Sequence, residues 1–344
     1  MWLKDLYDEG RGLTSREYPD SRERDSLLNA LLEDVLHLPR YAVLTDLFRE
    51  IDERDCGLFL DCARRLAAGE PLQYIVGWTE FCGRRFNVTP AVLIPRPETE
   101  LLCREAIGRI RRVFSDRVGE TRVSSIGGSD SVAGVELSDP SRGRKPLRIL
   151  DLCTGSGCIA WTLALELPGA EAVGVDISPA ALDVALNQGL LPESSREGAG
   201  LGRKEYLPVR PGRREGYFPK PPKFVEYDIL RGPENFESSL SCGKKFDVII
   251  SNPPYVRDSE RLLMRRNVLE HEPSLALFVP DGNPLKFYKA IRDWAERLLV
   301  PGGLLFLEQN EALADETATI CCNFSEVETV SDYFGKPRFT FARK

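Results

Sequence analysis

Apolar residues recur at helical spacing in the first part of the chain. Residues 27–36 carry leucines and Val35 on one stripe, and Pro39 ends the run because proline cannot continue a helix. Similar stripes over 41–50 and 54–68 predict two more helices, the second of them capped by Gly69. We therefore expect a small all-helical domain over residues 1–70.

The pattern changes after residue 70. Residues 81–86 have the composition of a hairpin, and Pro95 and Pro97 stiffen the chain that follows. We interpret 71–97 as a hairpin-like linker. Helical spacing returns over 98–114.

Strands and helices alternate in the rest of the chain. Short apolar runs predict strands at 147–150, 172–175, 224–227, 246–250 and 303–307, with helices at 158–167 and 179–188. This alternation is typical of an α/β fold with a parallel, doubly wound sheet, here over 98–344. A last antiparallel hairpin is expected from 326–330 and 338–342. Two polar stretches, 115–146 and 190–222, are interpreted as mobile insertions.

Composition narrows the possible functions. The net charge of −7 does not favour a general nucleic-acid binder, so no stable nucleic-acid complex is expected. The nine cysteines form no C-x-x-C pair and the two histidines are far apart, so no metal site is predicted. We expect reduced thiols, and the cytoplasm as the compartment, or an organelle matrix if a longer precursor exists. No apolar run reaches the roughly 18 residues that a membrane helix needs, so no membrane helix is expected. We also expect the protein to be a monomer.

The first chemical motif follows a predicted strand and opens a helix. Residues 153–157 read Cys-Thr-Gly-Ser-Gly, and the two glycines allow a tight turn that brings backbone amides close to a ligand. Asp176 ends the next strand, where a carboxylate can accept hydrogen bonds from a ribose diol. This pattern also matches a nicotinamide-dinucleotide site, so it predicts adenosine binding without choosing the cofactor.

The second motif is Asn252-Pro253-Pro254-Tyr255, which follows the strand at 246–250. Ligands lie beyond the carboxyl ends of strands in such sheets, so this segment is expected beside the glycine turn. The prolines donate no backbone hydrogen bonds, Asn252 adds a carbonyl and Tyr255 an aromatic face. Together they predict a slot that accepts both hydrogens of a planar NH₂ group.

Such a slot suits methyl transfer to an amide or aromatic amine. The nitrogen lone pair is delocalised, and holding both N–H groups on acceptors orients the nitrogen toward a sulfonium methyl. A hydride-transfer enzyme has no use for this slot. The second motif therefore favours an S-adenosylmethionine-dependent methyltransferase over an NAD-dependent oxidoreductase.

With these motifs the chain resembles the release-factor glutamine methyltransferases, apart from its two insertions. The matching stretches are 71–77, 93–100 (Leu-Ile-Pro-Arg-Pro-Glu-Thr-Glu), the glycine turn, 252–255 and 272–277. The resemblance implies a class I methyltransferase domain, a helical domain that docks the substrate protein, and methylation of the glutamine in the Gly-Gly-Gln motif of a peptide-chain release factor.

The resemblance also implies roles for individual residues. Cofactor contacts would fall on Cys153, Thr154, Gly155, Ser156, Gly157, Asp176, Asp228, Ile229 and Asn252. The glutamine slot, with the catalytic residues, would be Asn252, Pro253, Pro254 and Tyr255, and Leu93 or Ile94 would form a lid. Cys153 stands where the family often has glycine, so a positive φ there would strain it.

Three other functions stay open at this level. A methyltransferase for exocyclic amines of nucleic-acid bases shares the Asn-Pro-Pro-Tyr motif but needs a basic groove and base flipping. An NAD-dependent oxidoreductase would leave that motif unused. A non-catalytic adaptor is disfavoured because every motif is intact.

Overall fold

The computed structural model describes residues 1–117, 145–189, 219–239 and 245–344. These residues form two compact units. The first unit comprises residues 1–79, 87–94 and 260–274, and the second comprises 80–86, 95–259 and 275–344. The predicted insertions at 115–146 and 190–222 lie largely outside the described residues. No described helix is long and apolar enough to cross a bilayer.

Helices make up most of the first unit, as the apolar stripes predict. They are α1 (Leu3–Thr14), α2 (Ser21–Val35), α3 (Ala42–Thr45), α4 (Glu53–Ala67), α5 (Leu72–Val76) and α10 (Arg266–His271). Asp20 and Asp52 accept hydrogen bonds from first-turn amides of α2 and α4, which fixes where these helices begin. Gly69 has φ +86° just after α4, so the predicted C-cap is confirmed.

One expectation for this unit fails, and one helix is missed. Residues 41–50 form only the single turn of α3, because the chain then extends to pair with the N-terminus: Leu3 N donates to Arg49 O at 2.8 Å and Ile51 N donates to Met1 O at 2.9 Å. Helix α1 is not predicted at all, although its residues Leu3, Leu6 and Tyr7 are buried at helical spacing.

The predicted hairpin and the helix after it are confirmed. Strands β1 (Trp78–Phe81) and β2 (Arg84–Asn87) pair, and Cys82 and Gly83 between them both have positive φ, as a tight hairpin turn requires. Helix α6 (Pro97–Val113) begins with proline in its first turn, where the missing N–H costs nothing.

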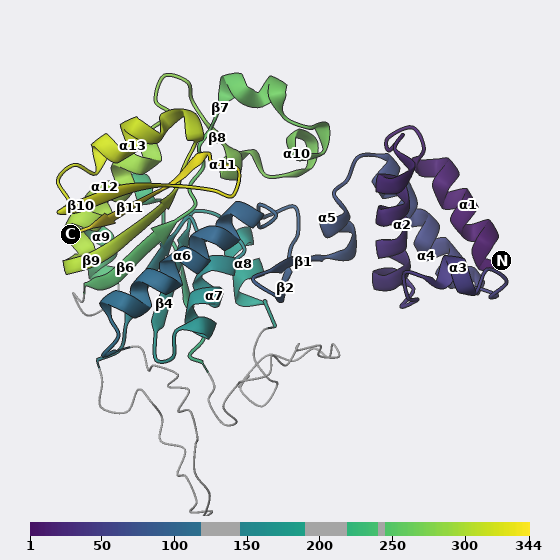
Figure 1. Ribbon diagram of the computed structural model, residues 1–344, viewed down its shortest axis with the longest axis horizontal. Helices are drawn as coiled ribbons and strands as arrows, with labels where there is room; N and C mark the ends of the chain where they lie inside the picture. Colours follow the sequence, from purple (N-terminus) through teal and green to yellow (C-terminus); the bar gives the residue numbers. More distant parts are fainter. Residues whose placement is uncertain (118–144, 190–218, 240–244) are drawn as a thin grey trace, which may run out of the picture. The chain divides into compact units, whose positions relative to one another are not determined.

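The second unit is built on a seven-stranded sheet of order β10-β11-β9-β6-β3-β4-β5 (Figure 1). Strands β3, β4, β5, β6 and β9 run parallel, while β11 and β10 add the predicted antiparallel hairpin. Their bounds are β3 (Arg148–Leu152), β4 (Glu171–Asp176), β5 (Lys223–Glu226), β6 (Phe246–Ser251), β9 (Leu299–Glu308), β10 (Glu326–Ser331) and β11 (Pro337–Arg343). The expected α/β class and doubly wound topology are confirmed.

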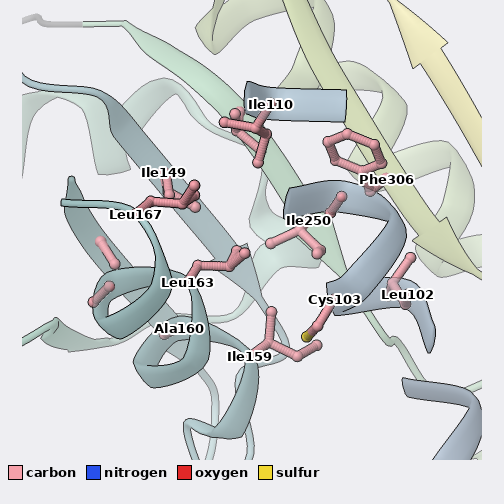
Figure 2. Close-up of a cluster of buried hydrophobic side chains, with 14 of the residues drawn as sticks. Leu102, Cys103, Ile110, Ile149, Ile159, Ala160, Leu163, Leu167, Ile250 and Phe306 are labelled. Atoms are coloured by element: carbon pink, nitrogen blue, oxygen red, sulfur yellow. The ribbon is translucent and has the colours of Figure 1, made fainter. Parts of the chain in front are cut away.

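Helices cover both faces of this sheet. On one face α6 and α7 (Cys158–Glu166) pack on Ile149, Ile250 and Phe306, as Figure 2 shows. On the other face α12 (Lys286–Leu298), which the sequence analysis does not predict, packs Trp294 and its neighbours against alternate residues of the same strands. A sheet buried on both faces explains why its strands read as continuous apolar runs.

Shorter elements complete the second unit. They are α8 (Pro179–Leu186), α9 (Glu234–Ser239), β7 (Val256–Arg257), α11 (Ser274–Leu277), β8 (Phe278–Val279) and α13 (Ala314–Ile320). Strand β7, directly after the Asn-Pro-Pro-Tyr segment, forms a separate parallel pair with β8.

Candidate active site

The order in which strands are added to the sheet reverses between β3 and β6. From β3 the chain proceeds outward to β4 and β5, and then returns to β6 on the other side of β3. This switch point is where open α/β sheets bind ligands, beyond the carboxyl ends of the strands. The register aligns these ends, because Leu152 pairs with both Val175 and Ser251, and Ser251 pairs with Leu307. The candidate site therefore includes the chain that follows β3, β4, β6 and β9.

The glycine turn follows β3, as predicted. Gly155 has φ +53°, and a Cβ built on it would meet nothing within 4 Å, so its backbone borders open space. Gly157 has φ +75°, but a Cβ there would approach Phe224 to 2.9 Å, so this glycine is needed for packing. Thr154 and Ser156 are buried, and Cys153 is partly exposed. Of the predicted turn residues, Cys153 and Gly155 offer the exposed surface.

Asp151, which the sequence analysis leaves out of the site, lies beneath this turn. Its Oδ2 accepts from Thr154 Oγ1 at 2.5 Å and from Ala160 N at 3.2 Å. Its Oδ1 is buried and has no hydrogen-bond donor among the described residues. Burial raises the pKa of Asp151 to about 7. An unsatisfied buried acceptor beside a glycine turn suits a ligand that carries N–H donors.

Asp176 ends β4 and holds the glycine turn in place. Its Oδ2 accepts from Gly155 N at 2.8 Å, and its Oδ1 accepts from Ser178 N at 3.0 Å. Burial raises its pKa above the ordinary value, while the backbone hydrogen bonds lower it. Each carboxylate oxygen keeps a further lone pair, so the side chain can still accept a bond from a diol.

Two of the three remaining predicted cofactor residues follow β5. Asp228 is partly exposed, and its side chain accepts from Leu230 N at 3.0 Å. Ile229 is 4% exposed and belongs to the core on the α12 face, where its carbonyl accepts from Trp294 Nε1 at 2.9 Å. Little of the Ile229 side chain is therefore available for a ligand.

The Asn-Pro-Pro-Tyr segment follows β6, next to the glycine turn. Pro253 and Pro254 are buried, and Asn252 and Tyr255 are partly exposed. Asn252 Nδ2 donates to Thr99 Oγ1 at 2.9 Å, and no donor among the described residues reaches Asn252 Oδ1. Tyr255 OH donates to Glu308 Oε1 at 3.0 Å. Burial and the nearby Glu308 raise the pKa of Tyr255 well above its ordinary value, so it remains a hydrogen-bond donor.

Leu93 and Ile94, the predicted lid, belong to the first unit. Leu93 is partly exposed, whereas Ile94 is buried and its backbone N donates to Glu272 Oε2 at 3.2 Å. Of the two, Leu93 has the more accessible side chain.

Thr99 and Glu308 are also absent from the sequence-based site. Thr99 lies in the Pro-Glu-Thr-Glu stretch that marks the start of α6, and Glu308 is the last residue of β9. The rule that ligands gather at the carboxyl ends of strands points to Glu308, since β9 neighbours β6. Thr99 gives no such signal, because its contact with Asn252 depends on the packing of α6.

Comparison with known proteins places this chain in a family. Residues 6–77 match the model described as the PrmC N-terminal domain. A release factor glutamine methyltransferase of Bacteroides thetaiotaomicron is 34% identical over 282 residues, which is 81% of this chain and 78% of the relative. The chain belongs to the release factor glutamine methyltransferase family. Another member, from Flavobacterium psychrophilum, is 32% identical over 93% of this chain and 91% of its own length.

Among solved structures, this family member is similar to a 16S rRNA N2 G1207 methyltransferase of T. thermophilus in complex with AdoMet and guanosine. The TM-score is 0.41 and the sequence identity 19%, over 78% of this chain and 49% of that chain.

In this family member the backbone at Cys153 takes the conformation that glycine prefers. Its φ is +61°, so the strain expected for a residue with a Cβ is present. Burial and the neighbouring Asp176 and Asp151 raise the pKa of the Cys153 thiol well above its ordinary value, so the thiol is neutral.

Two substitutions test this strain. Cys153→Gly is expected to leave the free energy of unfolding within about 1 kcal/mol of wild type, because relief of strain offsets the added entropy of the unfolded chain. Cys153→Val is expected to lose about 1 to 3 kcal/mol, since β-branched residues fit poorly at positive φ. Urea unfolding measures both. Equal stability of the two variants would contradict a strained Cys153.

Proposed function

We propose that this protein transfers a methyl group from S-adenosylmethionine to the side-chain amide nitrogen of the glutamine in the Gly-Gly-Gln motif of a peptide-chain release factor. The proposal is carried by one observation in a chain of this family: Asn252 has its amide NH₂ held by Thr99 and its carbonyl oxygen free of protein donors among the described residues. A free acceptor directly before two buried prolines and a tyrosine suits a planar amide NH₂.

The residues of the glycine turn fit the proposed cofactor. Asp151 Oδ1 is a buried acceptor without a described donor, which suits an amino group, and Gly155 borders open space. Asp176 has lone pairs left for a ribose diol. When bound, S-adenosylmethionine supplies an electrophilic methyl group on a sulfonium. We assign Cys153, Thr154, Gly155, Ser156, Gly157, Asp176, Asp228, Ile229 and Asn252 to the cofactor.

The substrate side of the reaction rests on positioning. An amide nitrogen is a weak nucleophile, and acceptors that hold both of its hydrogens orient it and favour the charge that develops during transfer. We assign these acceptors to Asn252 and the backbone carbonyls beside Pro253 and Pro254, with Tyr255 as an aromatic wall. Leu93 or Ile94 would serve as the lid, and the helical residues 1–70 would dock the substrate protein. We further propose a cytoplasmic monomer without stable nucleic-acid binding, because its substrate would be a translation factor.

The decisive experiment is transfer of a labelled methyl group to purified release factor. We expect label in the wild-type factor and none in a factor whose Gly-Gly-Gln glutamine is replaced by alanine. Duplex and single-stranded nucleic acid are assayed beside it, since they are the substrates of the alternative methyltransferase. Label in nucleic acid but not in the release factor would overturn the proposal.

A further inference from the structure

A carboxylate without solvent contact lies behind the proposed glutamine slot. Glu308, at the end of β9, is 0% exposed. Its Oε2 accepts from Thr99 Oγ1 at 2.7 Å, and its Oε1 accepts from Tyr255 OH at 3.0 Å. Thr99 is itself 3% exposed, so water does not compete for its bond to Glu308. Burying a carboxylate is costly, and hydrogen bonding offsets only part of that cost. The residue is therefore expected to have a use beyond stability.

The hydrogen bonds of Glu308 form a chain with one direction. An ionised carboxylate only accepts, so the single hydrogen of the Thr99 hydroxyl must go to Glu308. That leaves only lone pairs on Thr99 Oγ1, which can bind Asn252 through its NH₂ and not through its carbonyl. The two ends of an asparagine amide have nearly the same shape, so shape alone does not decide which end faces Thr99. The charge on Glu308 decides it.

We propose that Glu308 is a positioning residue that acts through Thr99 to make Asn252 present its carbonyl oxygen, and not its NH₂ group, to the substrate amide. The inference rests on the proposed function and deepens it. With the amide turned over, Asn252 would offer N–H groups to the N–H groups of the glutamine, and the slot would repel its substrate. Through Tyr255, the same carboxylate also fixes the aromatic wall of the slot.

Protonation of Glu308 would remove this preference for one orientation of the Asn252 amide. A neutral carboxyl group can donate to Thr99, whose hydroxyl can then donate to Asn252 Oδ1. Burial is the main cause that raises the pKa of Glu308 to about 7, with Glu98 raising it further and the bonds from Thr99 and Tyr255 lowering it. Arg338 on β11 also lowers it, although Glu311 holds that guanidinium at 2.9 Å. Tyr288 on α12 is the remaining titratable neighbour, and it stays protonated because burial raises its pKa.

The pH dependence follows from these groups. Because only the ionised form orders the slot, kcat should rise between pH 6 and pH 8 by roughly tenfold for a single group titrating near 7. The glutamine amide does not titrate in this range. Stability changes in the opposite direction: the folded state keeps a proton that the unfolded chain releases above the ordinary glutamate pKa of 4.5, so stability falls as pH rises to about 7. Protonation of Glu308 therefore stabilises the fold, so this group does not lower activity at pH 6 by unfolding the protein. Asp151 has a similar pKa, but it lies beside the glycine turn. We therefore expect its titration to change the KM for the cofactor and not kcat at saturating cofactor.

The test compares kcat and KM of Glu308→Gln, Thr99→Val and Thr99→Ser, at saturating cofactor, between pH 6 and pH 8. Glu308→Gln should flatten the pH profile of kcat. Thr99→Val should lower kcat by about tenfold, as expected for one lost hydrogen bond, with a small change in KM. Thr99→Ser keeps the hydroxyl and should stay within about twofold of wild type. The double variant Thr99→Val/Glu308→Gln should be within about twofold of Thr99→Val, because both act through Asn252.

Thr317→Val is the matched control. Thr317 on α13 is also buried, and its hydroxyl donates a hydrogen bond of 2.7 Å to Leu313 O, outside the hydrogen-bond chain of Glu308, Thr99 and Asn252. This variant should lose stability and keep kcat. A pH profile that stays steep in Glu308→Gln, or a Thr99→Val enzyme with wild-type kcat, would overturn the positioning role. Wild-type activity in the same assay separates that result from failure of the proposed function. If the proposed function is wrong, neither the wild type nor any variant transfers label to the release factor.

Discussion

Asn252→Ala is expected to lower kcat for methylation of the release factor by roughly a hundredfold or more, the usual effect of losing one preorganised polar group. The alanine removes the free carbonyl oxygen that would accept from the substrate amide, and it ends the hydrogen-bond chain from Thr99. Single-turnover kinetics at saturating cofactor measures the effect, because Asn252 is also assigned to the cofactor.

Asn252→Asp is the sharper variant. It keeps the shape of the side chain but offers Thr99 only lone pairs, while the Thr99 hydrogen is already given to Glu308. We expect this variant to be as slow as Asn252→Ala. Asn323→Ala is the control, since Asn323 is exposed and bonds Glu296 away from the site. Rates within threefold of wild type for both Asn252 variants would remove the slot from the mechanism.

Asp176→Ala is expected to weaken cofactor binding by about 1.5 to 3 kcal/mol, the range for hydrogen bonds to a charged group, which is roughly 10- to 150-fold in Kd. The loss has two sources: the proposed bonds to the ribose, and the bonds to Gly155 N and Ser178 N that fix the turn. Calorimetric titration with S-adenosylmethionine measures it directly.

Asp183→Ala supplies the comparison for that titration. Asp183 is an exposed aspartate on α8, and its carbonyl and side chain bond Asn187. Its removal should leave Kd unchanged. Asp176→Asn keeps one carbonyl acceptor and should fall between alanine and wild type. A wild-type Kd in Asp176→Ala would exclude this residue from the ribose site.

The sheet could be predicted from sequence because its strands are buried on both faces. Ile149 packs toward α6 and α7 while Leu150 packs toward α12, so both residues of each alternating pair are apolar and the run is easily recognised. The helix predicted over 41–50 is wrong for the converse reason: its apolar residues include Leu44 and Phe48, which are exposed, so their spacing does not indicate a buried helix face.

The site could be predicted only where a motif is local. The glycine turn and the Asn-Pro-Pro-Tyr segment are each continuous in sequence, and the strand before each one places it. Thr99 and Glu308 could not be assigned in this way, since their relation to Asn252 depends on three elements meeting in space. Ile229, a position taken from the family resemblance, is almost fully buried in the core, and its contact with the cofactor stays a prediction.

The members of the hydrogen-bond chain are far apart in sequence: Thr99 and Asn252 are separated by 153 positions, and Thr99 and Glu308 by 209. During synthesis the glycine turn and Asp176 are complete long before β9 leaves the ribosome. A nascent or truncated chain that ends before Glu308 would therefore carry the adenosine-binding signature without an aligned Asn252. Competence to methylate arises late, when the β9 strand joins the sheet beside β6.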